Sequence, residues 1–232
     1  MKTAPREHAT ATALPRAERA SADSETTRTR ILDAAERVFA RRGYAAATTQ
    51  ELAAEAGIQK RMLFYYFASK DEVYERVLER LLSGIQAIHG QFREEPGPEG
   101  LADFVAALVR AAAARPEPVL ILIREIMDEG PHLERIADRW VGPLFRAGRE
   151  EVRRNVERGI FAAHPADQLL TAIGGIALFQ ILTAPLARRV TGEDPLSPDN
   201  VERQVEVATH FALAGLHGAR GAAPAAKNRG TE

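Results

Sequence analysis

Apolar residues recur at helical spacing along most of this chain, beginning near residue 27. Ile31, Ala35 and Phe39 fall on one side of a helix, and polar residues occupy the other side. Gly43 follows where a left-handed residue would stop the helix. The pattern predicts a first helix from Thr27 to Gly43.

Two capping boxes mark the starts of further helices. Thr48 is followed three residues later by Glu51, an arrangement in which hydroxyl and carboxylate satisfy free N–H groups at a helix N-terminus. The same spacing recurs at Ser69 and Glu72. We therefore expect a short second helix ending near Gly57 and a longer helix beginning after Ser69.

The segment between these helices, residues 59–67, reads QKRMLFYYF and predicts a short third helix. At 100° per residue, Leu63 and Phe67 fall together and face a core. Met62 and Tyr66 flank them. The opposite arc carries two cations and two aromatic rings, which a short helix of a plain bundle seldom exposes: Lys60, Arg61, Phe64 and Tyr65.

Helical patterning continues to the end of the chain, and no alternating run indicates a strand. The further helices are expected over residues 99–114, 116–128, 131–159 with a break at Gly142-Pro143, 165–190 and 198–217. The segment EEPGPEG near residue 95 separates the short helices from this larger set. The sequence thus predicts an all-α protein: an N-terminal helix-turn-helix domain and a C-terminal helical bundle.

Composition narrows the function classes. The chain has no cysteine, which excludes disulfides, thiolate metal sites and cysteine nucleophiles and fits a reducing cytoplasm. It shows neither a signal-peptide pattern nor a run of about 18 apolar residues, so we expect a cytoplasmic, non-membrane protein. Residues 1–24 and 218–232 lack a periodic apolar face, and we expect a disordered arm and tail.

Positive charge gathers around the short helices. The formal net charge of the chain is −1, but residues 26–70 contain eight Lys and Arg against four Asp and Glu. A cationic face on the second helix of a helix-turn-helix is suited to the major groove of DNA, because Arg and Lys contact bases and phosphates. An alternative is that the aromatic residues only build the core.

These residues resemble the TetR family of transcriptional regulators. The resemblance covers about residues 26–85 and rests on many spaced positions at once: Thr29 to Ala35, Phe39, Gly43-Tyr44, Thr48-Thr49, Leu52-Ala53, Ala56-Gly57, Leu63 to Phe67 and Ser69 to Glu72. It implies a DNA-binding domain over residues 25–85, with its helix-turn-helix over residues 48–67, and a ligand-binding and dimerisation domain over residues 86–217.

Carried over position by position, the resemblance assigns roles in DNA binding. Backbone contacts are expected from Thr48, Phe64, Tyr65, Tyr66 and Lys70, and base contacts from Gln59, Lys60 and Arg61. Thr49 is expected among the DNA-binding residues as well. Three positions depart from the family pattern. Gln59 stands where a capping Ser is frequent, Arg61 where a small residue is frequent, and Phe64 where Tyr is usual.

The resemblance further implies a small apolar or aromatic effector bound in the bundle. The large side chains proposed for its pocket are Phe104, Ile123, Met127, Trp140, Phe145 and Phe179, with His89, Arg124 or His132 as polar partners. Residues 116–128 are apolar almost all round and should be enclosed by other helices. For each of these side chains, ordinary core packing remains the alternative.

The last two helices offer apolar faces with small residues, which suit a self-complementary four-helix interface. The residues expected in a homodimer interface are Ile173, Ile176, Ala177, Gln180, Ile181, Val201, Val205, Ala208 and Ala212. The alternative is that these faces only close the core of one subunit.

The implied function is a homodimeric repressor that binds a palindromic double-stranded DNA operator and is released by its effector. No cofactor and no metal site is expected. The six histidines form no HExxH or Glu-x-x-His pattern, and no nucleotide-binding or lipase-type motif occurs, so an enzyme is not expected. A DNA-binding architectural factor without an effector remains the other alternative.

Overall fold

The computed structural model describes residues 16–92, 97–163 and 165–216, and this part of the chain is all-α, as predicted. The helices are α1 (Arg16–Ala46), α2 (Thr49–Glu55), α3 (Lys60–Tyr66), α4 (Lys70–Phe92), α5 (Pro98–Ala114), α6 (Pro116–Met127), α7 (Leu133–Ile136), α8 (Gly142–Glu157), α9 (Ala166–Thr191) and α10 (Pro198–Leu216). A π-helical segment, η1 (Ala137–Val141), joins α7 to α8.

The N-terminal arm is shorter than expected. The arm was predicted over residues 1–24, but α1 already begins at Arg16, because the Ala, Arg and Glu residues of this stretch favour a helix. Gly43 interrupts α1 in the left-handed region, with φ 74°, and one further turn follows it. Residues 1–15 and the predicted tail, 218–232, lie outside the described residues.

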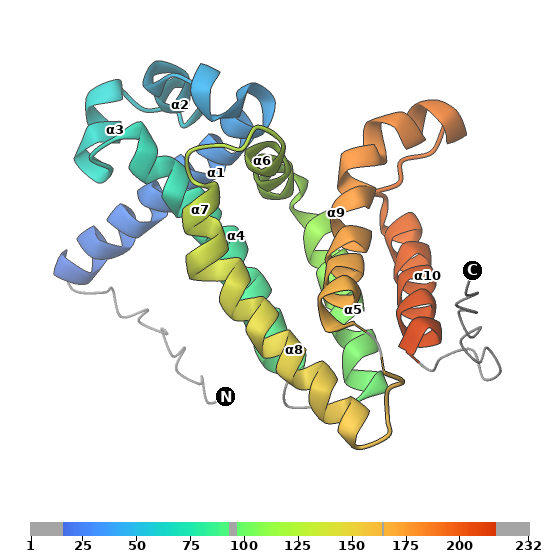
Figure 1. Cartoon of the computed structure of the whole chain (residues 1–232). Coiled ribbons are helices and arrows are strands. Elements are labelled where there is room, and N and C mark those ends of the chain that lie inside the picture. Colours follow the sequence, from blue (N-terminus) through green and yellow to red (C-terminus); the bar gives the residue numbers. More distant parts are fainter. Residues whose placement is uncertain (1–15, 93–96, 164, 217–232) are drawn as a thin grey trace, which may run out of the picture.

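The N-terminal head consists of α1–α3 and the first turns of α4, and two bundle helices contribute to its core. Its buried cluster includes Phe39, Leu52, Leu63, and also Ile121 of α6 and Ile136 of α7. Figure 1 shows α2 and α3 at one end of the molecule, with α4 running from the head into the bundle. The head is therefore packed firmly onto the bundle.

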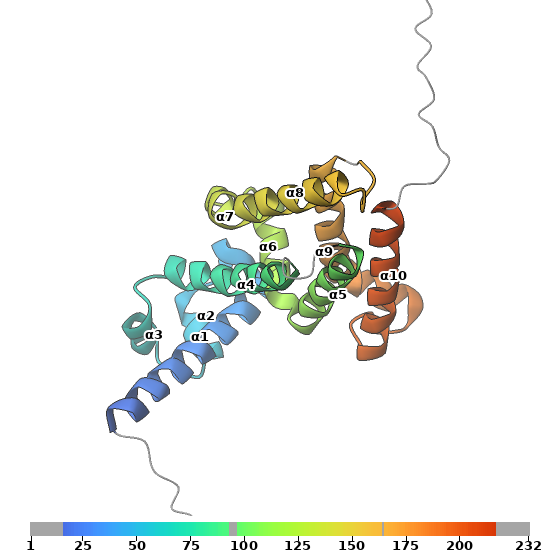
Figure 2. The ribbon, with the colours of Figure 1, turned by 90° about the horizontal axis from the view of Figure 1, so that it is seen from below.

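The bundle is organised around α5. This helix packs against α4, α9 and α10, while α8 packs against α9. Figures 1 and 2 both show α9 and α10 side by side, on the side of the molecule opposite α3. The α9–α10 pair and helix α3 thus lie at opposite ends of the molecule.

The predicted break at Gly142-Pro143 is instead a widened helical turn before the proline. The N–H of Gly142 donates to the carbonyl of Ala137, five residues earlier, and Pro143 lies in the first turn of α8. Proline has no N–H to donate, so the preceding turn changes its hydrogen-bond pattern and the chain continues as a helix. Trp140 and Val141 lie on this π turn.

Candidate nucleic-acid interface and apolar cavity

Helix α2 begins with the predicted capping box. Thr48 Oγ1 accepts a hydrogen bond from the N–H of Glu51 at 3.1 Å, and Glu51 Oε2 accepts one from the N–H of Thr48 at 3.0 Å. The backbone hydrogen bond from Thr48 is the main cause that lowers the pKa of Glu51. Thr48 is exposed and Thr49 half-buried, so the cap fixes both at the solvent edge of α2.

The turn between α2 and α3 depends on Gly57, whose φ is 66°. The N–H of Ile58 returns to the carbonyl of Ala53 at 2.9 Å and closes the turn. This geometry sets α3 at an angle to α2, as a helix-turn-helix requires.

The helical-wheel prediction for α3 is confirmed. Leu63 and Phe67 are buried in the head core. The α3 surface, defined as Lys60, Arg61, Phe64 and Tyr65, is exposed, and Tyr65 is 77% exposed. Met62 is exposed and Tyr66 half-buried beside them. The exposed side of α3 therefore combines cations with aromatic rings.

Gln59 occupies the N-cap position of α3 without acting as a cap. Its backbone has the extended geometry of an N-cap, with φ −76° and ψ 146°, but its side chain makes no capping hydrogen bond. The amide is exposed and stays available for a contact outside the chain. The departure from a capping Ser thus releases a side chain next to the α3 surface.

The cations of the head divide into two groups. Arg37 and Arg41 both pair with Glu55, at 2.8 and 2.7 Å, and hold α1 against α2. By contrast, Lys60 and Arg61 form no ion pair with the described residues, and Lys60 lies 5.9 Å from the ring centre of Phe64. The exposed side of α3 thus carries two adjacent cations that no acidic side chain of the described residues neutralises.

Lys70, expected at a phosphate, has an internal role. Its Nζ donates to the carbonyls of Tyr44 and Ala47 at 2.9 and 3.0 Å, and it lies 4.5 Å from the ring centre of Tyr44. The carbonyls that follow the interruption of α1 are thereby satisfied. Lys70 is half-buried and ties α1 to α4.

A polar network that the sequence did not predict joins the head to the bundle. Asp71 Oδ1 accepts from the hydroxyl of Tyr44 at 3.0 Å and lies 2.7 Å from Nε2 of the buried His132. The hydroxyl of Tyr74 donates to Glu125 at 2.7 Å, and the backbone N–H of His132 donates to the same carboxylate at 2.6 Å. Helices α1, α4 and α6 and the turn before α7 meet here.

The pKa shifts follow from these contacts. Burial acts to raise the pKa of Asp71, but hydrogen bonds from His132 and Tyr44 outweigh it, and its pKa lies below the usual range. Burial and the hydrogen bond to Glu125 raise the pKa of Tyr74. One ligand atom each of Asp71, Glu75 and His132 lie within 4.8 Å of one another. Arg135 pairs with Glu75, so these groups already have protein partners.

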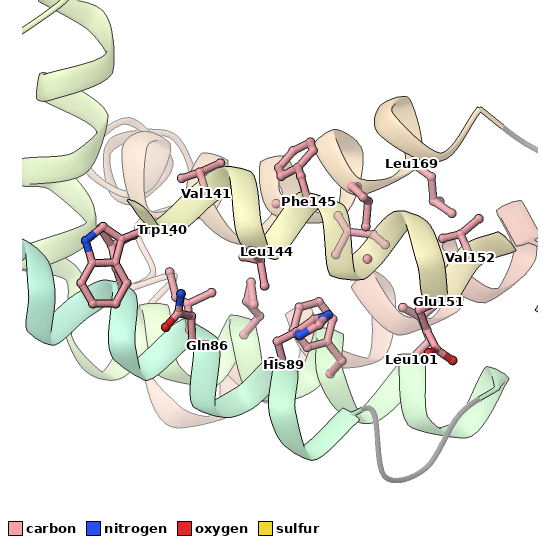
Figure 3. A pocket seen from close by; sticks show the side chains of 18 of the residues that line it. Gln86, His89, Leu101, Trp140, Val141, Leu144, Phe145, Glu151, Val152 and Leu169 are labelled. Carbon is pink, nitrogen blue, oxygen red and sulfur yellow. The ribbon is translucent and has the colours of Figure 1, made fainter. Parts of the chain in front are cut away.

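An apolar cavity of about 160 Å³ lies in the bundle among α4, α5, α8 and α9 (Figure 3). Three of the six predicted pocket residues line it, Phe104, Trp140 and Phe145, and so does the predicted polar partner His89. In Figure 3, Trp140 and Gln86 lie toward one end, while Glu151 and Leu169 lie toward the other. The cavity is the best candidate for a small-molecule site.

The remaining pocket predictions are wrong for this cavity. Ile123 is buried against α9, whereas Met127 and Phe179 are 71% and 64% exposed. The expectation that residues 116–128 are enclosed all round fails at Met127, because the last turn of α6 reaches solvent. His132 belongs to the polar network that joins the head to the bundle, and Arg124 is exposed near Gly43.

The expected dimer residues on α9 and α10 mostly close the core of the chain itself. Ile173, Ala177, Ile181, Val201, Val205, Ala208 and Ala212 are buried, and Ile176 and Gln180 are half-buried. The small residues permit close approach to α5 within the same subunit. The alternative reading of these faces is therefore the correct one for the buried positions.

The opposite sides of the same helices carry large exposed apolar residues. The α9–α10 face is defined as Phe179, Leu182, Leu186, Val190, Val207 and Phe211. α9 is long and apolar enough to cross a membrane by length and composition alone, and 22% of its most apolar window is buried. An apolar face of this extent indicates a surface that another partner covers.

Comparisons with known proteins identify the head. Residues 31–77 match a family profile described as "Bacterial regulatory proteins, tetR family". The HTH-type transcriptional repressor SCO4008 of Streptomyces coelicolor is 27% identical over 194 residues, which is 82% of this chain and 96% of that protein. The HTH-type transcriptional repressor NicS of Pseudomonas putida is 30% identical over 136 residues, 54% of this chain and 64% of that protein.

The fold of most of the chain matches solved regulators. The transcriptional regulator FadR from Bacillus subtilis, solved in complex with stearoyl-CoA, superposes with a TM-score of 0.63 at 16% identity, over 82% of this chain and 99% of that one. At this identity the match concerns the fold alone. The relatives are named as transcriptional regulators, so the prediction of a regulator and not an enzyme is confirmed.

Proposed function

The chain belongs to the TetR family of transcriptional regulators, and on that basis we propose that it is a homodimeric repressor released from its operator by a small molecule. The observation that carries the proposal is the α3 surface, where two unpaired cations and two aromatic rings face solvent on the second helix of a helix-turn-helix. The protein would act in the cytoplasm.

The α3 surface suits the major groove. Arg61 can reach O6 and N7 of a guanine in a bidentate contact, and the exposed amide of Gln59 can pair with an adenine. The exposed Tyr65 hydroxyl and the exposed edge of α2 at Thr48 can contact phosphate oxygens. Phe64 supplies an apolar contact in place of a hydroxyl. The operator is therefore expected to contain G·C pairs opposite Arg61.

The α9–α10 face supports a homodimer. A two-fold axis would place this face against its own copy, so that apolar residues of both subunits are buried together. A second subunit accounts for the exposed apolar side of α9 without a membrane. It also provides two α3 helices for two half-sites of a palindromic operator.

Release by a ligand can proceed through α4. The head end of this helix holds Lys70 and Asp71, and its bundle end supplies Gln86 and His89 to the cavity. A ligand that favours one tilt of α4 would change the separation of the two α3 helices, and this differential affinity is what allostery requires. FadR was solved with stearoyl-CoA; for this chain we propose a small apolar effector in the cavity.

The test is selection of bound DNA from a random pool with the full chain, followed by a screen for small molecules that release it. We expect a palindrome with two half-sites about one helical turn apart. Enrichment of no sequence would contradict the repressor function. A selected operator that no cavity-binding molecule releases would instead favour an architectural DNA-binding factor.

A further inference from the structure

The lining of the cavity restricts the charge of its ligand. Among the described residues that line it, Glu151 carries the one carboxyl group, and neither Lys nor Arg contributes. A carboxylate or phosphate placed here would lose its hydration without gaining a cation, and it would lie in the same cavity as the Glu151 carboxylate. Anionic ligands are therefore disfavoured.

Glu151 does not call for a cationic ligand either. Its Oε1 accepts a hydrogen bond from Nδ2 of Asn155 at 2.8 Å, and its Oε2 accepts one from Arg154. Neither partner lines the cavity. The charge of Glu151, which is 3% exposed, is thus balanced by the protein itself. A ligand ammonium group would lose its hydration, and it would find no unpaired carboxylate in the cavity to compensate.

Hydrogen-bonding capacity inside the cavity is small. Apart from Glu151, the polar groups of the lining are the side chains of Gln86 and His89 and the indole N–H of Trp140. The ring of His89 packs edge-on against Phe104 at 5.9 Å. The half-buried Gln86 lies near Trp140 at one end, as Figure 3 shows. Its amide offers both a donor and an acceptor. One uncharged polar group of a ligand can be satisfied there.

The volume of the cavity limits the size of its ligand. A dry apolar cavity of about 150 Å³ is large enough to hold benzene, and this cavity measures about 160 Å³. Together these observations lead us to propose that the ligand is an uncharged apolar molecule, the size of one ring or a short alkyl chain, with at most one uncharged polar group that meets Gln86. The proposal rests on the proposed function of the cavity as the effector site and names its ligand class.

Trp140 makes the binding step directly observable, because it lines the cavity and is the single tryptophan of the chain. We would titrate the full chain with hexan-1-ol, hexanoate and hexylammonium and follow tryptophan fluorescence. Hexan-1-ol should give a saturable change, and both ions should bind at least about tenfold more weakly because a buried charge must be desolvated. Equal or tighter binding of either ion overturns the proposal, and so does the absence of a saturable change with hexan-1-ol up to its solubility limit.

A matched pair of glycine variants locates the site. A Cβ at Gly174 or at Gly84 would meet no atom within 4 Å, but only Gly174 lines the cavity, whereas Gly84 faces solvent on α4. Gly174→Leu should weaken hexan-1-ol binding at least about tenfold by filling the cavity, and Gly84→Leu should leave it unchanged. Equal effects of the two variants contradict the location. The titrations with hexan-1-ol, hexanoate and hexylammonium use the unaltered chain. They therefore test the ligand class even if Gly174→Leu does not fold.

Operator release is measured separately with the same compounds. Hexan-1-ol that binds at Trp140 and leaves the DNA complex intact supports the ligand class while contradicting the effector role of the cavity. Release by hexanoate together with tighter binding of hexanoate supports the effector role while overturning the ligand class. The two failures are thus distinguishable.

Discussion

Two surfaces of this molecule expose large aromatic or aliphatic side chains, and they differ in what accompanies them. On the α3 surface, Phe64 and Tyr65 alternate with Lys60 and Arg61. On the α9–α10 face, six large apolar residues are exposed on two neighbouring helices. Exposed aromatic residues among unpaired cations suit a polyanion, whereas a cluster of large exposed apolar residues suits another apolar protein surface.

The comparison also separates two uses of exposed apolar residues within one chain. Both surfaces stand opposite well-packed buried residues, Leu63 and Phe67 on α3 and Ile173 and Ala177 on α9. The buried side fixes the helix, and the chemistry of the exposed side selects the partner. Substitutions at the two surfaces should therefore affect different steps of operator binding.

The largest effect is expected from introducing charge into the α9–α10 face. The double variant Phe179→Glu and Phe211→Glu places four carboxylates in the proposed interface and should convert the dimer to a monomer. Loss of the second half-site should lower operator affinity at least about 100-fold. Sedimentation velocity and operator titration would measure the two effects.

The matched control is Met127→Glu, which changes another large exposed apolar residue in α6, outside the face. It should remain dimeric and bind the operator normally. A double variant that stays dimeric at the concentrations of the titration would contradict the assignment of this face.

The next effect concerns base reading by α3. Arg61→Ala should cost about 1–3 kcal/mol at the selected operator and relax the preference at the contacted base pair. Its loss on random DNA should be smaller. Operator and random duplexes would be compared by fluorescence anisotropy at one salt concentration.

Arg37→Ala removes the same charge from α1, where Arg37 pairs with Glu55. Similar losses for Arg37→Ala and Arg61→Ala would mean that total charge, and not the α3 surface, determines specificity.

A smaller effect distinguishes the two lysines. Lys60→Ala should weaken operator binding and lower the slope of affinity against salt by about one, while leaving thermal stability unchanged. Lys70→Ala should instead lower the free energy of unfolding by about 1–2 kcal/mol, because two backbone carbonyls lose their donor. Thermal unfolding and salt titrations of both variants make the test. A salt-slope change for Lys70→Ala without destabilisation would restore its predicted phosphate role.

The smallest effect lies at the junction between the head and the bundle. Because the folded state lowers the pKa of Asp71, its contribution to stability is complete above the ordinary aspartate value of about 3.9 and is lost as the pH falls through the lowered value. Asp71→Asn should therefore reduce the decrease in the free energy of unfolding that accompanies a fall in pH. Asp103→Asn, at an exposed position of α5, is the control. The same decrease for wild type and Asp71→Asn, measured by urea unfolding, would exclude this linkage.

What the sequence predicted well depends on contacts between near neighbours in the chain. The capping box at Thr48, the turn at Gly57 and the wheel of α3 involve residues within about one or two helical turns. Their geometry follows from local pattern and chirality, so the helix-turn-helix and the all-α class could be predicted from the sequence.

What the sequence missed depends on distant partners. Lys70 bonds to carbonyls 26 and 23 residues away, and Tyr74 bonds to Glu125 across 51 residues. Phe179 and Ala177 lie two positions apart in one apolar helix, and only packing against α5 and α6 decides which is buried. Periodicity shows that α9 has apolar sides but does not show which side packs against other helices of the same chain.

The π turn at Ala137–Val141 has a consequence for how this cavity can change over evolutionary time. Such a turn holds one more residue than an α-helical turn, so a single-codon deletion here can return this segment to a regular α-helix while the helices before and after it keep their faces. Trp140 and Val141, which lie on the turn and line the cavity, would then change position relative to Phe145 and Gly148. One mutational step can thus alter the wall of the cavity without changing any residue of α3.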